Sequence, residues 1–475
     1  MLELLLNTLK DFDGAEYLIK ESKTRRIENY NIKKQSEMFR EVEVTELFLT
    51  LYVTFSEESG GGEPVKYRGS YNTVIHPGTS ADELRKIIKH GLFAARFVKN
   101  AWFPLVSPCA ADDKTGNAAG GAGSNATGST TCCSGSNTAS STADDIKLLA
   151  AIQTAFYAND THAEGRLSYS EFFLTRSDVR IINSSGVDVK YSASGVYAET
   201  AVHWRSEKNG EIEISEMFRF NLPANVNVAC DMLKERIGQL FTVAEKKSAA
   251  QPTPQVGDIN ILLSGACLAE FFSYYHSCAN TQMIYQHLST FKDGEQIQTG
   301  DGSGCEGSGC EGCGCDRLTL TLDPLMEGSD SSYPYDNDGL RVYPETIIKD
   351  GKLLKYWGNT RFAAYLGIQP TGSISNYHIT GGIYKAEDLR KEPYLELISF
   401  SAFQINPVTG DFGSEIRLGF YFDGEKTVAV TGGSITGNIA GVQNNMRMSV
   451  EEKQYNNYRG PATICIRGAS ISSVV

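Results

Sequence analysis

The first 250 residues alternate between segments with helical and with strand periodicity. Residues 46–55 are rich in β-branched and aromatic side chains, which predicts a strand. Ser80 and Glu83 have capping-box spacing and precede apolar residues at helical spacing, so we expect a helix through residue 95. From residue 167 to 220 the period is mostly two, which predicts an antiparallel meander followed by a helix near residues 226–241.

Residues 106–143 interrupt this pattern. They are rich in Gly, Ser and Thr and cannot bury a core, so we predict a flexible insert. Asp144 is then the expected cap of another helix. Residues 251–254, Gln-Pro-Thr-Pro, have the composition of a linker.

The last 220 residues are rich in strand and turn signals. Residues 318–322 alternate cleanly, and residues 341–357 form an expected hairpin that turns at Asp350 and Gly351. We therefore predict an α+β fold, with an N-terminal α/β lobe followed by a large antiparallel β-rich C-terminal domain. The predicted divisions are an N-terminal α/β domain (1–105), the flexible insert (106–143), a middle β-meander plus helices (144–250), and a C-terminal β-rich domain (251–475) with a Cys-rich loop (301–316).

Composition and charge narrow the functional classes. The 475 residues carry a formal net charge of −13, which argues against direct nucleic-acid contact. No stretch has the length and apolarity of a membrane span, and the N-terminus lacks the pattern of a signal peptide. The eleven cysteines are unevenly spaced, which favours a reducing, cytoplasmic location over a disulfide framework.

The residues after a predicted strand and turn at 258–265 carry candidate chemistry. A helix-borne zinc peptidase needs two histidines about one turn apart and a glutamate that works on the metal-bound water. Here Glu270 is present, but Ala269 stands at the first histidine position and Tyr274 one turn later. Neither is a usual zinc ligand, and we expect His276 on a different helix face from Ala269.

The segment from Glu270 to Tyr275 and several later stretches resemble the TldD/TldE (PmbA) metallopeptidase-related family. In that family TldD-type chains carry His-Glu-x-x-x-His and TldE-type chains lack it, so this sequence resembles the TldE type. The later stretches with similar order and spacing are residues 335–339 (Tyr-Asp-Asn-Asp-Gly), 348–353, 370–376, 405–412 (Ile-Asn-Pro-Val-Thr-Gly-Asp-Phe) and 435–438 (Ile-Thr-Gly-Asn).

The resemblance implies a role and a set of partners. It implies a non-catalytic, zinc-free subunit of a metallopeptidase system that acts in cytosolic proteolysis or peptide maturation, shapes a cavity and binds unfolded peptide. Partners would be a second copy or a TldD-type zinc peptidase, with no cofactor and no membrane. Some family names refer to modulation of DNA gyrase, and the charge of −13 makes such an effect indirect. The family's third ligand is a cysteine near the C-terminus; residues 454–458 have none, and Cys465 falls later, in a strand.

The candidate site therefore centres on one glutamate. Glu270 is a vestigial catalytic candidate, although a glutamate that is simply paired or solvated on a helix face explains it as well. Tyr274 and Tyr275 fit packing residues that line a former cleft. The full set of expected cavity-lining residues is Ala269, Tyr274, Tyr275, His276 and Asn376.

A rival signal lies in the Cys-rich loop. Cys305, Cys310, Cys313 and Cys315 place four thiols within eleven residues, a set that can hold zinc or an iron–sulfur cluster. Their spacing matches no standard four-ligand site and belongs to a short repeat, which favours a surface insert. Two alternatives thus stay open: a stand-alone homodimeric peptide-binding module, and a hydrolase that uses Glu270 or metal at this loop. We expect the chain to be inactive alone.

Overall fold

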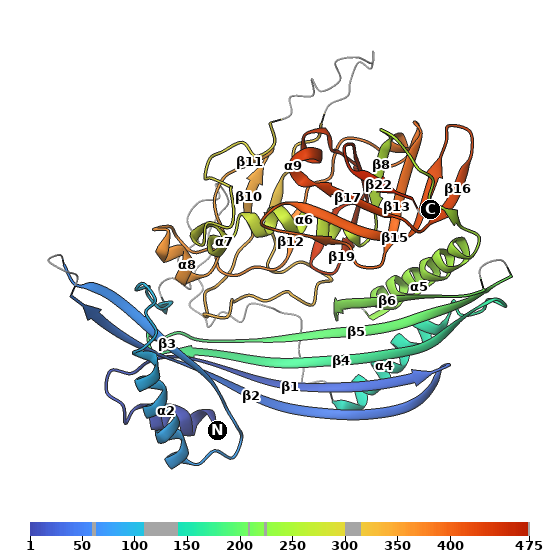
Figure 1. The fold of residues 1–475 in the computed structure, drawn as a ribbon. Helices are drawn as coiled ribbons and strands as arrows, with labels where there is room; N and C mark the ends of the chain where they lie inside the picture. The colour runs from blue at the N-terminus through green and yellow to red at the C-terminus, as the bar shows by residue number, and fades with distance from the viewer. Residues whose placement is uncertain (59–62, 109–140, 208–209, 223–225, 300–314, 474–475) are drawn as a thin grey trace, which may run out of the picture.

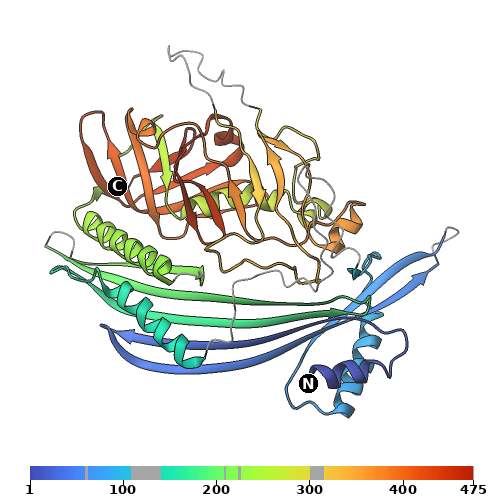
Figure 2. The same cartoon turned by 180° about the vertical axis from the view of Figure 1, so that it is seen from behind.

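The computed structural model describes residues 1–58, 63–108, 141–207, 210–222, 226–299 and 315–473. Two lobes follow one another along the chain (Figure 1), a long curved sheet with helices and, above it, a compact β-rich body. The C-terminal lobe lies over β6 and α5 at one end and reaches β1 through the Lys20–Asn337 hydrogen bond at the other, and the view from behind gives the same arrangement (Figure 2).

The N-terminal lobe is built on one antiparallel sheet of six strands in the order β3-β2-β1-β4-β5-β6. Strand β1 pairs with β4 from Leu18↔Asn183 to Ile32↔Tyr169, so segments on both sides of residues 109–140 share this sheet. The strands are β1 (Glu16–Ile32), β2 (Gln35–Glu57), β3 (Val65–Ile75), β4 (Gly165–Asn183), β5 (Asp188–Ser206) and β6 (Gly210–Asn221).

One face of this sheet carries the helices. Ile19 and Ile27 lie eight residues apart in β1, hence on the same face, and belong to the two cores of this lobe. Helices α1 (Leu2–Leu9) and α2 (Ala81–Ala95) pack on the first core, and α4 (Thr142–Tyr157) and α5 (Val226–Ser248) on the second. The capping box of Ser80 and Glu83 is present as predicted.

Two local predictions were wrong. Ser141, not Asp144, is the N-cap of α4, because the Asp144 amide donates to Ser141 Oγ (3.2 Å) and Asp144 lies inside the first turn. The predicted linker at residues 251–254 is part of a sheet: β7 (Gln251–Pro252) pairs with β16, and the buried Thr253 donates its amide to Thr431 O (3.0 Å). Pro252 is tolerated there because β7 is an edge strand.

The C-terminal lobe holds two sheets around helix α6 (Cys267–Cys278), whose core joins apolar residues of both. One sheet has the order β11-β10-β9-β12-β20-β19, and the other follows β18-β21-β8-β13-β15-β16-β7. The remaining strands are β8 (Asn260–Ser264), β9 (Leu320–Leu322), β10 (Glu345–Lys349), β11 (Lys352–Leu353), β12 (Tyr377–Ile379), β13 (Tyr394–Phe400), β14 (Gln404–Ile405), β15 (Asp411–Phe422), β16 (Thr427–Thr431), β17 (Ser434–Asn438), β18 (Arg447–Met448), β19 (Glu452–Tyr455), β20 (Tyr458–Pro461), β21 (Thr463–Ile466) and β22 (Ser470–Ser472). Short helices are α7 (Thr281–Tyr285), α8 (Thr360–Tyr365) and α9 (Ile439–Val442), with 3-10 turns η1 (Asp388–Arg390) and η2 (Gln443–Asn445).

The predicted α+β class is confirmed. The hairpin of β10 and β11 turns at Asp350 and Gly351, both with positive φ, as the sequence predicted. Most strand pairs of the C-terminal lobe are antiparallel, and three are parallel: β8 with β13, β12 with β20, and β7 with β16. Among the helices that the structure describes, none has the length and apolarity needed to cross a membrane.

Candidate functional site around helix α6

The site begins where β8 turns into α6. All five residues of β8 are buried, and Gly265 turns the chain with φ +90° beside Ile398 O. A side chain at this φ would be strained, so glycine fits the turn. The helix then buries one face in the core through Leu268, Phe271, Phe272 and Tyr275. Its other face looks onto two hollows, and the predicted strand, turn and helix are thus all present.

Glu270 lies between two hollows. The first, which we call the α6 cavity, has a volume of about 320 Å³ and is lined by Ala269, Glu270, Ser273, His276, Ser375, Tyr377 and Asn457. The second, the interlobe groove, has a volume of about 960 Å³ and runs between β6 and α5 on one side and the C-terminal lobe on the other. Among the described residues, none donates a hydrogen bond to the Glu270 carboxylate or pairs with it.

His276 is held as a neutral ring on the wall of the α6 cavity. Its Nε2 bonds to Ile374 O at 2.9 Å, which makes Nε2 the protonated nitrogen, and the ring lies 4.2 Å from the Trp357 ring and 5.0 Å from the Tyr377 ring, centroid to centroid. Burial lowers the pKa of His276 to about 4. The prediction that His276 faces away from Ala269 was wrong, because seven residues are almost two full turns and both line the same cavity.

The other expected lining residues point elsewhere. Tyr275 is fully buried, with its hydroxyl donating to Gln443 Oε1 (3.2 Å), and Tyr274 packs on the Phe291 ring, 6.0 Å between centroids. Asn376 is buried too, accepting from Ser329 Oγ (2.7 Å) and donating to Ser332 Oγ (3.0 Å). The structure therefore brings Ala269, Glu270 and His276 together, and Tyr274, Tyr275 and Asn376 are not on the cavity wall.

Four lining residues were not predicted from the sequence. Ser375 and Tyr377 line the cavity while Asn376 between them faces away, as alternation in an extended segment requires. The Tyr377 hydroxyl donates to Ala269 O, and Asn457 Nδ2 donates to Ser375 O (2.9 Å). The resemblance to family motifs at residues 370–376 and 454–458 indicates these two segments but does not give the directions of their side chains. Ser273 donates to Glu270 O (2.7 Å).

The residues at the two histidine positions do not fit a zinc ion. Ala269 has no ligand atom, and burial raises the pKa of the Tyr274 phenol, so it stays protonated. His276 Nε2 carries a proton directed at Ile374 O. The wall contributed by residues 454–458 is Asn457, an amide. In the part of the chain that the structure describes, no group of three His, Cys, Asp or Glu side chains could hold a metal.

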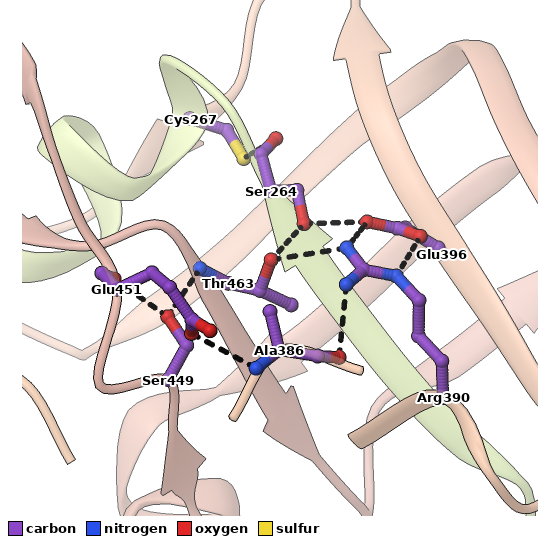
Figure 3. Close-up of polar contacts among 8 residues, drawn as sticks. All are labelled: Ser264, Cys267, Ala386, Arg390, Glu396, Ser449, Glu451 and Thr463. Carbon is purple, nitrogen blue, oxygen red and sulfur yellow. Dashed lines mark hydrogen bonds and ion pairs between the residues drawn. The ribbon is translucent and has the colours of Figure 1, made fainter. Parts of the chain in front are cut away.

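A buried polar network fixes the floor of the interlobe groove beside the start of α6 (Figure 3). Arg390 donates two hydrogen bonds to the Glu396 carboxylate, from Nε to Oε2 (2.8 Å) and from Nη2 to Oε1 (2.5 Å). Ser264 Oγ also donates to Glu396 Oε1 (2.7 Å), and Thr463 Oγ1 accepts from Arg390 Nη2 (3.2 Å). The network ties β8, β13 and β21 together, so it positions the turn at Gly265 that precedes α6.

The walls of the groove combine a strand edge, charges and aromatic rings. Ile214–Met217 of β6 form one wall, and within the described residues β6 pairs only with β5. Arg236 of α5 binds Glu216 at 2.6 Å. The C-terminal lobe contributes rings and charges to the opposite wall, among them Phe400, Phe403, Phe420 and Lys453.

The Cys-rich loop is only partly described. Cys305, Cys310 and Cys313 lie outside the described residues. Cys315 is half-buried, and the single proton of its thiol can be donated to Asp316 O (3.3 Å) or Gln443 O (3.5 Å). Burial raises the pKa of the Cys315 thiol, which favours the protonated form over the thiolate that binds metals.

Known proteins share parts of this sequence. Residues 256–473 match the family model of the PmbA/TldA metallopeptidase C-terminal domain. "Metalloprotease PmbA" of Escherichia coli O157:H7 is 30% identical over 137 residues, 28% of this chain and 30% of that protein. A Methanocaldococcus jannaschii protein of uncharacterized function is 23% identical over 274 residues, 55% of this chain and 59% of that protein. The matched stretches thus span less than two thirds of either relative.

Solved structures share the fold over the whole chain. A proposed modulator of DNA gyrase from Thermotoga maritima superimposes with a TM-score of 0.71 at 14% identity, covering 100% of both chains. A similarly described protein from Bacteroides thetaiotaomicron gives 0.70 at 21% identity, covering 100% of this chain and 98% of that one. TldE from Thermococcus kodakarensis gives 0.70 at 16% identity, covering 99% of each. By the family-model match, the C-terminal lobe is related to the PmbA/TldA metallopeptidase C-terminal domain. Together these matches support the resemblance to the TldD/TldE (PmbA) family that the motifs predicted.

Proposed function

We propose that this chain is a non-catalytic, zinc-free subunit of the TldE (PmbA) type that holds unfolded peptide for a zinc-bearing partner. The observation that carries the proposal is the pairing of Glu270, exposed to both hollows, with Ala269 and Tyr274 at the two histidine positions. A peptidase glutamate acts on metal-bound water, and without the ligands it has no such water to deprotonate.

The interlobe groove supports binding of an extended peptide. Its volume of about 960 Å³ is at the upper end of ordinary ligand pockets. Among the described strands β6 pairs only with β5, so its other edge can accept an extended segment. The rings opposite would take apolar side chains, and Glu270 would accept hydrogen bonds from peptide amides or an amino terminus. Such binding recognises the peptide backbone more than particular side chains, so it suits unfolded substrates of varied sequence.

We further propose that the chain works in the cytosol, in proteolysis or peptide maturation, as a hetero-oligomer with a TldD-type zinc peptidase. The charge of −13 makes direct binding to DNA unfavourable, so an effect on gyrase would pass through a processed peptide or protein.

The test is reconstitution. The full chain is co-expressed with a TldD-type chain that carries His-Glu-x-x-x-His, and cleavage of an unstructured fluorogenic peptide is followed. We expect activity from the mixture, none from this chain alone, and loss of activity when the partner's histidines are replaced. Glu270→Gln in this chain should raise KM about tenfold and leave kcat unchanged, because it removes a binding contact only. A mixture as inert as the separate chains contradicts the proposal.

A second candidate is a stand-alone peptide-binding module, favoured by the groove being formed within one chain. It predicts peptide binding by the isolated chain and no gain in cleavage on adding any TldD-type chain. A hydrolase that uses Glu270 or the Cys-rich loop predicts cleavage by the chain alone. That cleavage would disappear with Glu270→Ala or with removal of residues 301–316.

A further inference from the structure

In the part of the chain that the structure describes, half of strand β2 has a neighbouring strand on one side only. Strand β3 pairs with β2 only from Leu47 to Glu57, whereas β1 pairs with β2 from Gln35 onward. Over residues 38–46, β1 is therefore the only strand neighbour of β2 among the described residues. This stretch, the free β2 edge, lies on the side of the sheet farthest from the C-terminal lobe (Figure 1).

The free β2 edge is exposed on both faces as well as along its backbone. Met38, Phe39 and Val44 keep 41%, 45% and 43% of their surface accessible, although strands this long usually bury one face. Proteins normally shorten, cover or twist such edges because unpaired amides and carbonyls next to apolar side chains recruit other strands. The edge thus has the two features, free backbone groups and exposed apolar side chains, that pairing with a further strand uses.

The two faces of this edge differ in chemistry. Leu47 and Leu49 are buried under the helices, so Phe39, Glu41, Glu43 and Thr45 lie on the helix face by alternation. The opposite face carries Met38, Arg40, Val42, Val44 and Glu46. Arg40 is already paired with the buried Glu28. The face beside the helices is therefore acidic, and the opposite face is mainly apolar.

Charge argues against a second copy at this edge. Two identical antiparallel strands in one sheet are related by a two-fold axis that keeps each face, so the axis passes through a residue facing its own copy. Centring the pair on Glu41 or Glu43 sets that carboxylate against itself. Centring it on Val42 sets Glu41 against Glu43 twice. Like charges directly opposite destabilise a strand pair, so the symmetric registers centred on Glu41, Val42 and Glu43 are disfavoured.

We propose that residues 38–46 dock a β-strand from a different protein chain. That strand would present Lys or Arg opposite Glu41 and Glu43, and apolar side chains opposite Met38, Val42 and Val44. The inference rests on the proposed function in taking the zinc-bearing subunit as the natural partner. The chemistry of the partner strand follows from the edge alone.

The first experiment uses the full chain and a synthetic peptide in which Lys and Val alternate over nine positions. Binding is measured by fluorescence anisotropy and located by hydrogen exchange. We expect protection of residues 38–46, and binding about tenfold weaker in Glu41→Lys/Glu43→Lys. Glu58→Lys/Glu63→Lys, the same charge change in the segment that connects β2 to β3, away from residues 38–46, should bind like the parent chain. A matching Glu/Val peptide should not bind.

A second experiment tests the exclusion of the second copy. Sedimentation velocity should give no edge-mediated dimer for the parent chain, whereas Glu41→Thr/Glu43→Thr should self-associate at lower concentration because the repulsion is gone. Protection, in the isolated parent chain, of those amides of residues 38–46 that do not bond to β1 overturns the proposal, as does Lys/Val peptide binding unaffected by Glu41→Lys/Glu43→Lys. Cleavage by the mixture of this chain with the zinc-bearing chain is then compared for the parent chain and for Glu41→Lys/Glu43→Lys. Equal cleavage refutes the docking surface and leaves the proposed function standing. If mixing the two chains never produces cleavage, the binding experiment with the Lys/Val peptide still tests the free β2 edge.

Discussion

The neutral state of His276 can be tested directly by titration. A pKa of about 4 against an ordinary 6.5 corresponds to about 3 kcal/mol of preference for the uncharged ring. The cause is burial of the ring, which packs against two aromatic rings; the bond to Ile374 O acts the other way and offsets part of the lowering of the pKa. The unfolded chain takes up a proton near pH 6.5 and the folded chain only near pH 4. The free energy of unfolding should therefore fall as the pH drops from about 6.5 to about 4. Below pH 4 His276 should cause no further change.

The assay has two parts. Ring-labelled histidine NMR should show the His276 resonances constant down to about pH 5, while the fold persists. Denaturation of the parent chain and of His276→Gln, at pH 7.5 and 5.0, should reveal a difference that shrinks by about 2 kcal/mol at the lower pH, because glutamine does not titrate. The same substitution at the exposed His76 is the control. A His276 resonance that moves near pH 6.5 refutes the burial argument.

Three further predictions concern the scaffold. Glu396→Ala should destabilise the fold by about 1–3 kcal/mol in urea melts, because the partly exposed Arg390 loses its carboxylate partner and Ser264 loses an acceptor; the double change to Ala at both positions should cost less than the sum. Asp336→Ala should cost about 2–4 kcal/mol by the same measurement, since its buried carboxylate accepts three backbone amides; unchanged stability would contradict that account. Phe272→Ala should lower the melting temperature and reduce the free energy of unfolding by about 3–5 kcal/mol, because it leaves a cavity beside the Tyr458 ring. A loss below about 1 kcal/mol would mean that α6 is not anchored there.

Local patterns carried most of what could be predicted. The capping box at Ser80, the turn at Asp350 and the strand, turn and helix around Gly265 depend on neighbours in the chain, so the sequence contains them directly. The cap of α4 was misassigned because both Ser141 and Asp144 are good capping residues. Only the backbone geometry shows which one lies outside the helix.

The site could be predicted only as a set of segments. The direction of Asn376, away from the cavity that Ser375 and Tyr377 line, depends on the phase of the extended segment. A motif comparison does not give that phase. The interlobe groove was not predicted at all, since its walls come from β6, α5 and the C-terminal lobe, which are distant in sequence and meet only after both lobes have formed.

The pairing of β1 with β4 has a consequence for how the chain is made. Strand β1 lies in the middle of its sheet, and one of its neighbours is synthesised only after residue 165. As the chain leaves the ribosome, β1 and β2 can form a hairpin early, but its inner edge stays open until β4 emerges. Contacts of such high sequence separation slow folding and expose strands to misassembly. We therefore expect truncated chains that end before β4 to aggregate during synthesis, and chaperones to engage the nascent protein in that interval.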